Sequence, residues 1–391
     1  MKVITRTILV LSLVSLFTDM ASEMLYPIMP VYLRSIGFSF LLIGVLEGVA
    51  EATAGLSKGY FGKSSDVSGR RMPFVQWGYA LSAISKPMMA LFVYPLWIFT
   101  ARTIDRFGKG IRTGARDALL SDESTPLNKG QVFGFHRGMD TLGAVVGPLI
   151  ALIYLYFHPA DYKRLFLMAF LPGMCAILFT LFIKEKKRPV SSVNTKKNFL
   201  VLFSYWKSSN PSYKKLVLGL LIFALFNSSD VFLLLKVKSD GLSDASLIGM
   251  YIFYNLVYAL ASYPFGILAD KLGLKKVFLS GLVLFAIVYA GFAINNNHML
   301  FYILFFLYGL YAAATEGVSK AWVSNIVPQT ETATAIGTFA GLQSLCALVA
   351  SSLTGLLWVN LGVGITFTIT SCTSVGVIVY LSLYKTNPQV K

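Results

Sequence analysis

Long apolar runs separated by short polar stretches form the hydrophobic pattern of this chain. A helix needs ~20 apolar residues to cross the ~30 Å hydrocarbon core of a bilayer, and runs of that length recur along almost the whole sequence. Lipid offers no partners to backbone N–H and C=O groups, so such runs fold as helices packed into a bundle. The pattern predicts twelve membrane spans, at residues 8–33, 39–62, 72–94, 96–115, 131–156, 164–184, 215–236, 246–268, 276–295, 299–319, 334–358 and 361–384.

The composition agrees with this interpretation. Of the 391 residues, 55% are hydrophobic and 13% are charged, whereas soluble domains carry about 25% charged residues. The net charge of +16 would suit nucleic-acid binding if it clustered on a soluble face, but the positive-inside rule predicts the same excess on cytoplasmic loops. When residues in the outer turns of a span are counted with the adjoining loop, 26 of the 34 Lys and Arg residues lie on the same side of the membrane as the N-terminus and five on the opposite side. The other three, Lys86, Arg102 and Arg106, lie within spans. We therefore expect both termini in the cytoplasm and no nucleic-acid partner.

A basic connector, residues 184–215, divides the spans into six plus six. The predicted domains are an N-terminal six-helix bundle (1–184), a cytoplasmic linker (185–214) and a C-terminal six-helix bundle (215–391). Within the linker, "FLVLFSYW" is too short to span a bilayer, and we interpret it as an interfacial segment. The segment after Lys2 and Arg6 is too long for a cleaved signal peptide and lacks a small-residue cleavage site, so it is predicted to be the first span.

The two halves repeat at an offset of 204 residues. "GKSSDVSGRR" aligns with "GILADKLGLKK", which pairs Gly62 with Gly266, Asp66 with Asp270 and Gly69 with Gly273. The same offset places Arg112 on Glu316 and Arg116 on Lys320. Two similar bundles in parallel orientation are what a rocking alternating-access transporter requires.

The pattern Gly62-x-x-x-Asp66-x-x-Gly69-Arg70-Arg71 after the second span resembles motif A of the major facilitator superfamily. The second copy is degenerate, since Leu274 stands where the first copy has Arg70, and Val67 departs from the family pattern. The resemblance implies two pseudo-symmetric six-helix bundles, and a network that latches the outward-facing state on the cytoplasmic side.

In span 5, Gly143-x-x-x-Gly147-Pro148 is similar to motif C of the family's antiporters. Small residues at this spacing also serve plain helix packing, which is the alternative for this motif. Arg112 and Arg116 continue the charged face of span 4 toward the cytoplasm. The residues predicted to gate transport are Gly62, Asp66, Gly69, Arg70, Arg71, Arg112, Arg116, Gly143, Gly147, Pro148, Asp270, Gly273 and Lys320.

Ionisable residues within spans are costly in hydrocarbon and indicate function by default. By the resemblance, spans 1, 4, 7 and 10 line a central cavity, and the predicted substrate-binding residues are Asp19, Glu23, Arg102, Arg106, Asp230, Tyr254, Asn255 and Glu316. A carboxylate in an apolar cavity can bind and release a proton near neutral pH. The predicted proton carriers are Asp19 and Glu23, followed by Glu47, Glu51 and Asp140.

Structural ion pairs are the alternative role for these groups, above all for Asp105 and Asp140, which have basic residues nearby in sequence. Lys86 and Lys236 are interpreted as snorkelling toward the membrane surface. The three cysteines are odd in number and lie in apolar runs, so they indicate neither a disulfide framework nor a metal site.

The sequence contains no Walker loop and no paired nucleophile and base, so we expect neither an enzyme nor a cofactor. It predicts a monomeric secondary active transporter of the bacterial inner membrane. The expected substrate is a small polar, zwitterionic or chelating organic solute, drug-like or siderophore-like, moved by proton-coupled antiport. A divalent metal or cation transporter of the same fold and a non-transporting membrane receptor are the alternative predictions.

Overall fold

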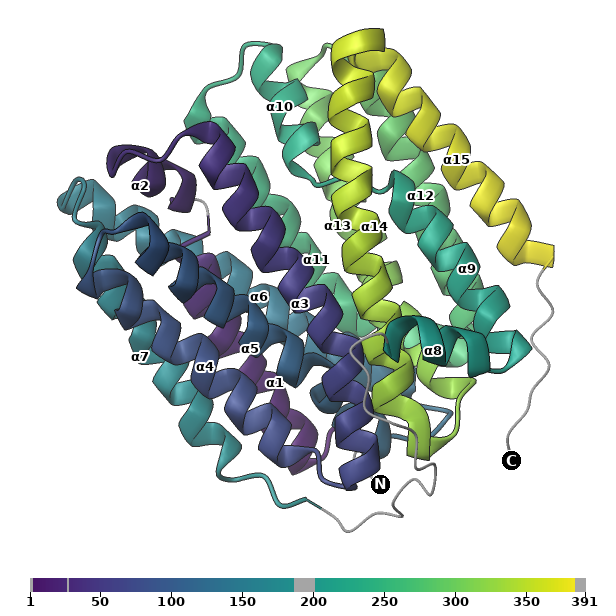
Figure 1. The fold of residues 1–391 in the computed structure, drawn as a ribbon. Helices are drawn as coiled ribbons and strands as arrows, with labels where there is room; N and C mark the ends of the chain where they lie inside the picture. Colours follow the sequence, from purple (N-terminus) through teal and green to yellow (C-terminus); the bar gives the residue numbers. More distant parts are fainter. Residues whose placement is uncertain (1–2, 27, 186–200, 384–391) are drawn as a thin grey trace. The chain divides into compact units, whose positions relative to one another are not determined.

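The computed structural model describes residues 3–26, 28–185 and 201–383, and every regular element within these ranges is a helix. Figure 1 labels them along the chain. Their bounds are α1 Arg6–Glu23, α2 Met29–Ser35, α3 Phe40–Ser68, α4 Met72–Leu91, α5 Pro95–Asp122, α6 Lys129–Phe157, α7 Tyr162–Thr180, α8 Val201–Ser208, α9 Pro211–Phe226, α10 Val231–Ser239, α11 Asp244–Leu272, α12 Leu274–Ile294, α13 His298–Asn325, the 3-10 helix η1 Gln329–Glu331, α14 Thr332–Leu361 and α15 Val363–Leu383.

The all-helical membrane fold predicted from the sequence is confirmed, and ten of the twelve predicted spans each correspond to one long helix. Eight helical segments among the described residues are long and apolar enough to cross a membrane: α6, α7, α9 with α10, α11, α12, α13, η1 with α14, and α15. The predicted interfacial segment forms the short helix α8.

Two predicted spans, 8–33 and 215–236, are each interrupted in the structure. The first is divided into α1 and α2, and the second into α9 and α10. After the first interruption, α2 has a proline in its first turn, and proline lacks the N–H that a continuing helix needs. In the second, Asn227 leaves the helical region with φ −88° and ψ 85°, and the Ser229 hydroxyl accepts the N–H of Val231 at 3.4 Å. Short polar side chains compete in this way with helical hydrogen bonds.

The helices form two compact units. The main helix contacts within one unit are repeated by the corresponding helices of the other. Unit 1 comprises Met1–Thr125, Met139–Ser208 and Pro328–Ser344. Within it, α4 packs against α5 and α7, α3 packs against α5, and α1 packs against α7. An apolar core that includes Met24, Leu25 and Phe166 joins these helices.

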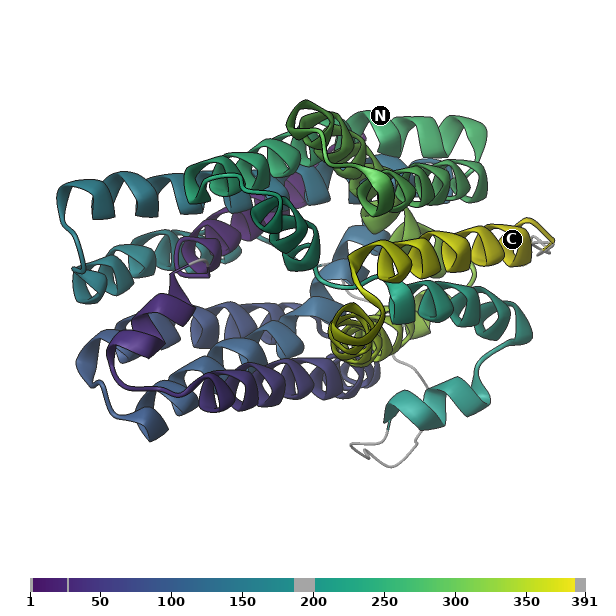
Figure 2. The same cartoon turned by 90° about the horizontal axis from the view of Figure 1, so that it is seen from above.

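Unit 2 comprises Pro126–Gly138, Ser209–Val327 and Leu345–Lys391. Here α12 packs against α13 and α15, α11 against α13, and α9 against α15; Figure 2 shows α9 and α15 side by side. These four contacts correspond, helix by helix in the sequence repeat, to the four contacts named in unit 1.

Two helices are shared between the units: the start of α14 belongs to unit 1 and the start of α6 belongs to unit 2. Glycines allow both segments to approach at backbone distance. A methyl group added at Gly62 of α3 would lie 2.3 Å from the carbonyl oxygen of Ala333. One added at Gly266 of α11 would lie 2.3 Å from that of Gly130. The repeat seen in the sequence thus reappears as two equivalent helix contacts.

We expect Gly62→Ala to destabilise the protein by about 1–3 kcal/mol, because the added carbon has no room against α14. Gly48→Ala is the matched control, since it lies on the same helix and its added carbon would meet nothing within 4 Å. Thermal unfolding of the purified protein in detergent measures both. Equal midpoints for the two variants would contradict the close contact.

Candidate functional site

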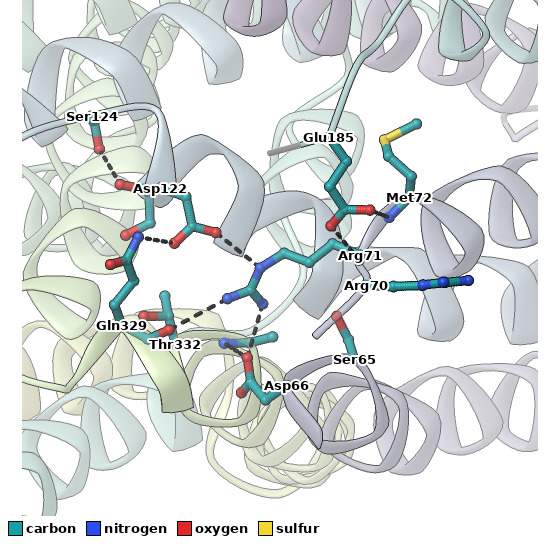
Figure 3. A network of polar contacts seen from close by, with 12 residues as sticks. Ser65, Asp66, Arg70, Arg71, Met72, Asp122, Ser124, Glu185, Gln329 and Thr332 are labelled. Atoms are coloured by element: carbon teal, nitrogen blue, oxygen red, sulfur yellow. Dashed lines mark hydrogen bonds and ion pairs between the residues drawn. The ribbon is translucent and has the colours of Figure 1, made fainter. Parts of the chain in front are cut away.

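Asp66 stands near the end of α3 and reaches the first turn of α14 (Figure 3). Its carboxylate accepts the backbone N–H of Ala333 at 3.3 Å and that of Thr334 at 2.7 Å, together with the Thr334 hydroxyl at 2.7 Å. The first N–H groups of a helix have no partner within the helix, and the helix dipole makes that end positive. Asp66 therefore supplies acceptors for the unpaired N–H groups of α14 and places a negative charge at the positive end of its dipole. Gly69, with φ 64°, ends α3 in the left-handed conformation that suits glycine.

Arg71 holds Asp66 from the other side. Its Nη1 donates to Asp66 Oδ1 at 2.9 Å, and its Nε forms an ion pair with Asp122 Oδ2 at 2.9 Å. Its Nη2 donates to the carbonyl of Gln329 at 3.4 Å, and the Gln329 amide in turn donates to Asp122 at 3.0 Å. Figure 3 shows the guanidinium at the centre of this network. Arg71 is 3% exposed and Asp66 6%, whereas Arg70 is exposed.

Glu185, which the sequence analysis missed, positions Arg71. Its carboxylate accepts the backbone N–H of Arg71 at 2.6 Å and that of Met72 at 3.1 Å, so it caps α4 (Figure 3). Asp122 was missed as well. The one signal for Glu185 was an acidic residue in an otherwise basic connector, and its partner lies 114 positions away.

Asp270 repeats the cap at the start of α6. Its two carboxylate oxygens accept the N–H groups of Gly130 and Gln131, each at 2.7 Å. The Gln131 side chain donates to the Tyr263 hydroxyl at 2.6 Å. Gly273, with φ 101°, ends α11. The second copy lacks the arginine: the repeat of Arg71 is Lys275, which donates to the carbonyl of Ser382 at 2.8 Å.

A line of buried charge follows α5 through unit 1. Lys86 lies 3.0 Å from Asp105, and Arg102 lies 3.8 Å from the same carboxylate. Lys86 is only 1% exposed, so its interpretation as a snorkelling residue is corrected. Burial of an ammonium group demands a counter-ion, which Asp105 supplies. Farther along α5, Arg106 lies 3.2 Å from Glu51.

The next turns of α5 bury two more arginines. Arg116 pairs with Asp117 at 2.8 Å, donates to Ser15 at 3.1 Å and lies 4.0 Å from Asp140. The Ser15 hydroxyl also donates to Asp140. Arg112 donates to Ser82 at 2.5 Å, and its guanidinium lies 4.6 Å from the centre of the Tyr79 ring. Arg112 and Arg116 are 4% and 8% exposed, so they belong to the interior of unit 1.

The motif C-like glycines of α6 pack against α1. A methyl group on Gly143 would lie 2.3 Å from the Leu16 carbonyl oxygen, and one on Gly147 would lie 2.5 Å from that of Met20. Pro148 follows within α6. The same contact brings α6 beside Asp19, whose Cβ would be 3.1 Å from the Gly143 methyl. Glu23 is the last residue of α1. The side chain of Glu47 lies outside the part of the structure that is described.

In unit 2, Asp230 follows the end of α9 and accepts a hydrogen bond from the Tyr254 hydroxyl of α11. The structure thus brings together two of the predicted substrate-binding residues. Asn255 is buried, and its amide donates to the Tyr251 carbonyl of its own helix at 3.0 Å. The two remaining predicted residues, Glu316 and Lys320, are half-buried and one turn apart on α13.

Long apolar helices, an internal twofold repeat and a carboxylate cap in each copy define a multi-pass integral membrane protein of the transporter class. The family model of the Major Facilitator Superfamily matches residues 11–254 and 216–391. The chain is 34% identical over 361 residues to an uncharacterized MFS-type transporter of Methanocaldococcus jannaschii, covering 91% of this chain and 89% of the relative. The chain belongs to the major facilitator superfamily.

Other matches agree with this family. A multi-drug resistance efflux pump PmrA homolog of Lactococcus lactis is 23% identical over 355 residues, covering 87% of this chain and 84% of the relative. The human organic anion transporter MFSD10 has a TM-score of 0.81 at 17% identity, covering 96% of this chain and 99% of its own. The E. coli fucose:proton symporter FucP has a TM-score of 0.76 at 10% identity, covering 99% and 100%. These two structures share the fold.

Lys86→Met should destabilise the protein by about 3–5 kcal/mol, because it leaves Asp105 buried without its closest cation. Glu51→Gln removes a pair whose carboxylate side chain is 41% exposed, and exposed pairs contribute about 0–1 kcal/mol. Thermal or denaturant unfolding in detergent compares the two. A larger loss for Glu51→Gln would show that the Lys86 pair is not the structural one.

Proposed function

We propose that this chain is a secondary active transporter that moves a small polar, zwitterionic or chelating organic solute by alternating access, in exchange for protons. The observation that carries the proposal is the pair of carboxylate caps, Asp66 on α14 and Asp270 on α6. Contacts of this kind are reversible, because water can replace a carboxylate at a helix start. They therefore suit a gate that forms and breaks in each cycle.

The capped helices support this role by their division between the units. The start of α14 belongs to unit 1 and its remainder to unit 2, while α6 is divided the opposite way. Each helix start lies in the same unit as its carboxylate, but the rest of the helix continues in the other unit. A movement of one unit could therefore be transmitted along the helix and draw its start away from the carboxylate. We infer that Asp66 and Asp270 stabilise one end state and are released in the other.

The Lys and Arg distribution assigns the sides. The segment after α3 and the connector after α7 carry much of the basic excess, and the positive-inside rule places such segments in the cytoplasm. We propose that the two caps close the cytoplasmic side, with both termini on that side of a bacterial inner membrane.

Charges of both signs inside unit 1 favour a polar or zwitterionic solute over a purely apolar one. Arg102, Arg106 and Arg112 lie along α5, and Asp19 lies on α1. The efflux-pump relative supports export as the direction of transport. The proton symporter of the same fold supports proton coupling.

We propose Asp19 and Glu23 as the first proton carriers, as the sequence predicts, and we assign a different role to Glu51 and Asp140. Glu51 is paired with Arg106 at 3.2 Å, and Asp140 accepts a hydrogen bond from Ser15 beside Arg116. A carboxylate held by a permanent cation releases its proton too readily to carry one at neutral pH. Glu51 and Asp140 are therefore proposed as structural partners of the buried arginines.

The function is tested with protein in proteoliposomes, after a thermal-shift screen of organic solutes has identified a ligand. Flux of that ligand should rise several-fold with an opposing proton gradient, and Asp19→Asn together with Glu23→Gln should abolish the rise. Asp161→Asn is the control, because Asp161 caps α7 in a loop outside the spans and Asn caps as well as Asp. Ligand binding without flux would instead favour a receptor.

The gate is tested by hydrogen exchange of the Ala333 and Thr334 amides, whose N–H groups donate to the Asp66 carboxylate. Arg71→Gln leaves Asp66 without its buried cation, a loss of roughly 3 kcal/mol, and every 1.4 kcal/mol changes an equilibrium about tenfold. We expect these amides to exchange about 100-fold faster. Arg70→Gln, in the same motif but exposed, should leave exchange within about twofold of wild type. Equal protection in both variants would reject the role of Arg71, and unchanged flux in Asp66→Asn would reject the gate.

A further inference from the structure

The interruption between α9 and α10 concentrates oxygen acceptors inside the membrane. Because α9 ends at Phe226, its last carbonyls lose the N–H groups of a following turn. The residues that fill the gap are Asn227, Ser228, Ser229 and Asp230. Polar groups at this depth require partners, since lipid supplies none.

The fold itself does not demand this polarity. At the repeat offset of 204, Ser228 and Ser229 correspond to Met24 and Leu25 in the interruption between α1 and α2. Met24 and Leu25 are 2% and 1% exposed and belong to the apolar core of unit 1. The middle of the interruption is therefore apolar in one copy and polar in the other, so the fold does not require the two serines, while Asn227 and Asp230 correspond to Glu23 and Tyr26.

Asp230 is not used to cap α10. It occupies the N-cap position, but its side chain makes no capping hydrogen bond. Its carboxylate accepts the Tyr254 hydroxyl, and the Ser229 hydroxyl at 3.3 Å. Within the described part of the chain, Asp230 has no Lys, Arg or His within ion-pair distance, unlike Asp105, Glu51 and Asp140 of unit 1. A half-buried membrane carboxylate without a cation calls for one from outside the chain.

Further oxygens lie at the interruption. The Asn227 side-chain oxygen has no hydrogen-bond partner among the described residues. The Ser228 hydroxyl belongs to a residue that is 4% exposed, and it interacts with the hydroxyl of the fully buried Tyr289. One unpartnered amide oxygen and a pair of buried hydroxyls thus lie next to one carboxylate.

Tyrosines enclose the interruption from one end to the other. Asn227 donates to the Tyr311 hydroxyl at 3.0 Å, and Tyr254 donates to Asp230. Between them Tyr308 packs on both rings, with centroids 5.4 Å from Tyr311 and 5.3 Å from Tyr254. Rings in mutual contact leave no aromatic cage for an organic ammonium group, so a small ion fits the enclosure best.

We propose that the interruption between α9 and α10 binds a single Na⁺ ion. The charge fits a monovalent ion, because one carboxylate is joined by the negative C-terminal end of α9, equivalent to roughly half a charge. Ca²⁺ takes six to eight oxygen ligands, and Mg²⁺ demands near-ideal octahedral geometry and usually keeps several waters. Unwound backbone and helix C-terminal ends coordinate Na⁺ in broken membrane helices generally. The site does not depend on the proposed proton exchange.

Binding is tested by thermal unfolding of the full-length protein in detergent, with NaCl, KCl or choline chloride at one ionic strength. Na⁺ should raise the midpoint in a saturable manner, and K⁺ and choline should not. Asp230→Asn should abolish the Na⁺ response, and Ser228→Ala should raise the half-saturating Na⁺ concentration at least tenfold. Asp240→Asn is the matched control at the other end of α10, where Asp240 pairs with Lys236, and it should keep the response.

Equal effects of the three salts on the unfolding midpoint would overturn the site. A rise with choline alone, or an unchanged response to Na⁺ in Asp230→Asn, would overturn it as well. Should Asp230→Asn fail to fold, the shift of half-saturation in Ser228→Ala decides the question. The outcome is separable from that of the proposed function. A rise of the unfolding midpoint with Na⁺ alone, without proton-driven flux, supports the Na⁺ site and rejects proton exchange. Proton-driven flux without a Na⁺-specific rise of the midpoint rejects the Na⁺ site and supports proton exchange.

Discussion

A carboxylate at the start of a helix is the interaction on which this structure depends. Asp66 meets two unsatisfied backbone donors and the positive end of α14 in a single contact. That contact requires α3 and α14 to approach at backbone distance, which Gly62 permits. It also requires a cation to share the carboxylate, which Arg71 supplies, and a fixed loop to hold that cation, which Glu185 secures. Each part of the motif named here thereby has a physical task.

The second copy shows which parts of this arrangement are indispensable. Asp270, Gly266 and Gly130 reproduce the carboxylate and the close approach, while the arginine is replaced by a lysine that turns elsewhere. Backbone capping is thus common to both copies, and the charged network around Arg71 and Asp122 belongs to the first alone. The two caps share a geometry and differ in their charged partners.

Much of the fold follows from the sequence because membrane burial leaves a strong signal. Run length and the repeat predicted an all-helical bundle, and the motif spacing identified Asp66 and Asp270. The interruptions in the first and seventh spans were not predicted, since hydropathy averages over a few polar residues such as Ser228. The partners Asp122 and Glu185 were missed because they lie far from Arg71 in the chain. Lys86 was misread because a lone lysine in a span gives no sign of its counter-ion Asp105.

The sharing of α6 and α14 between the two units has a consequence for how the protein is made. During synthesis, residues 1–125 emerge long before residues 328–344, which complete their compact unit. Until then the Asp66 carboxylate lacks the backbone N–H groups of α14 from which it accepts hydrogen bonds. The first half of the chain therefore stays incompletely packed until residues 328–344 have been synthesised. Such reciprocal exchange of segments makes the two halves of a duplicated chain interdependent, as strand exchange does for the partners of a swapped dimer.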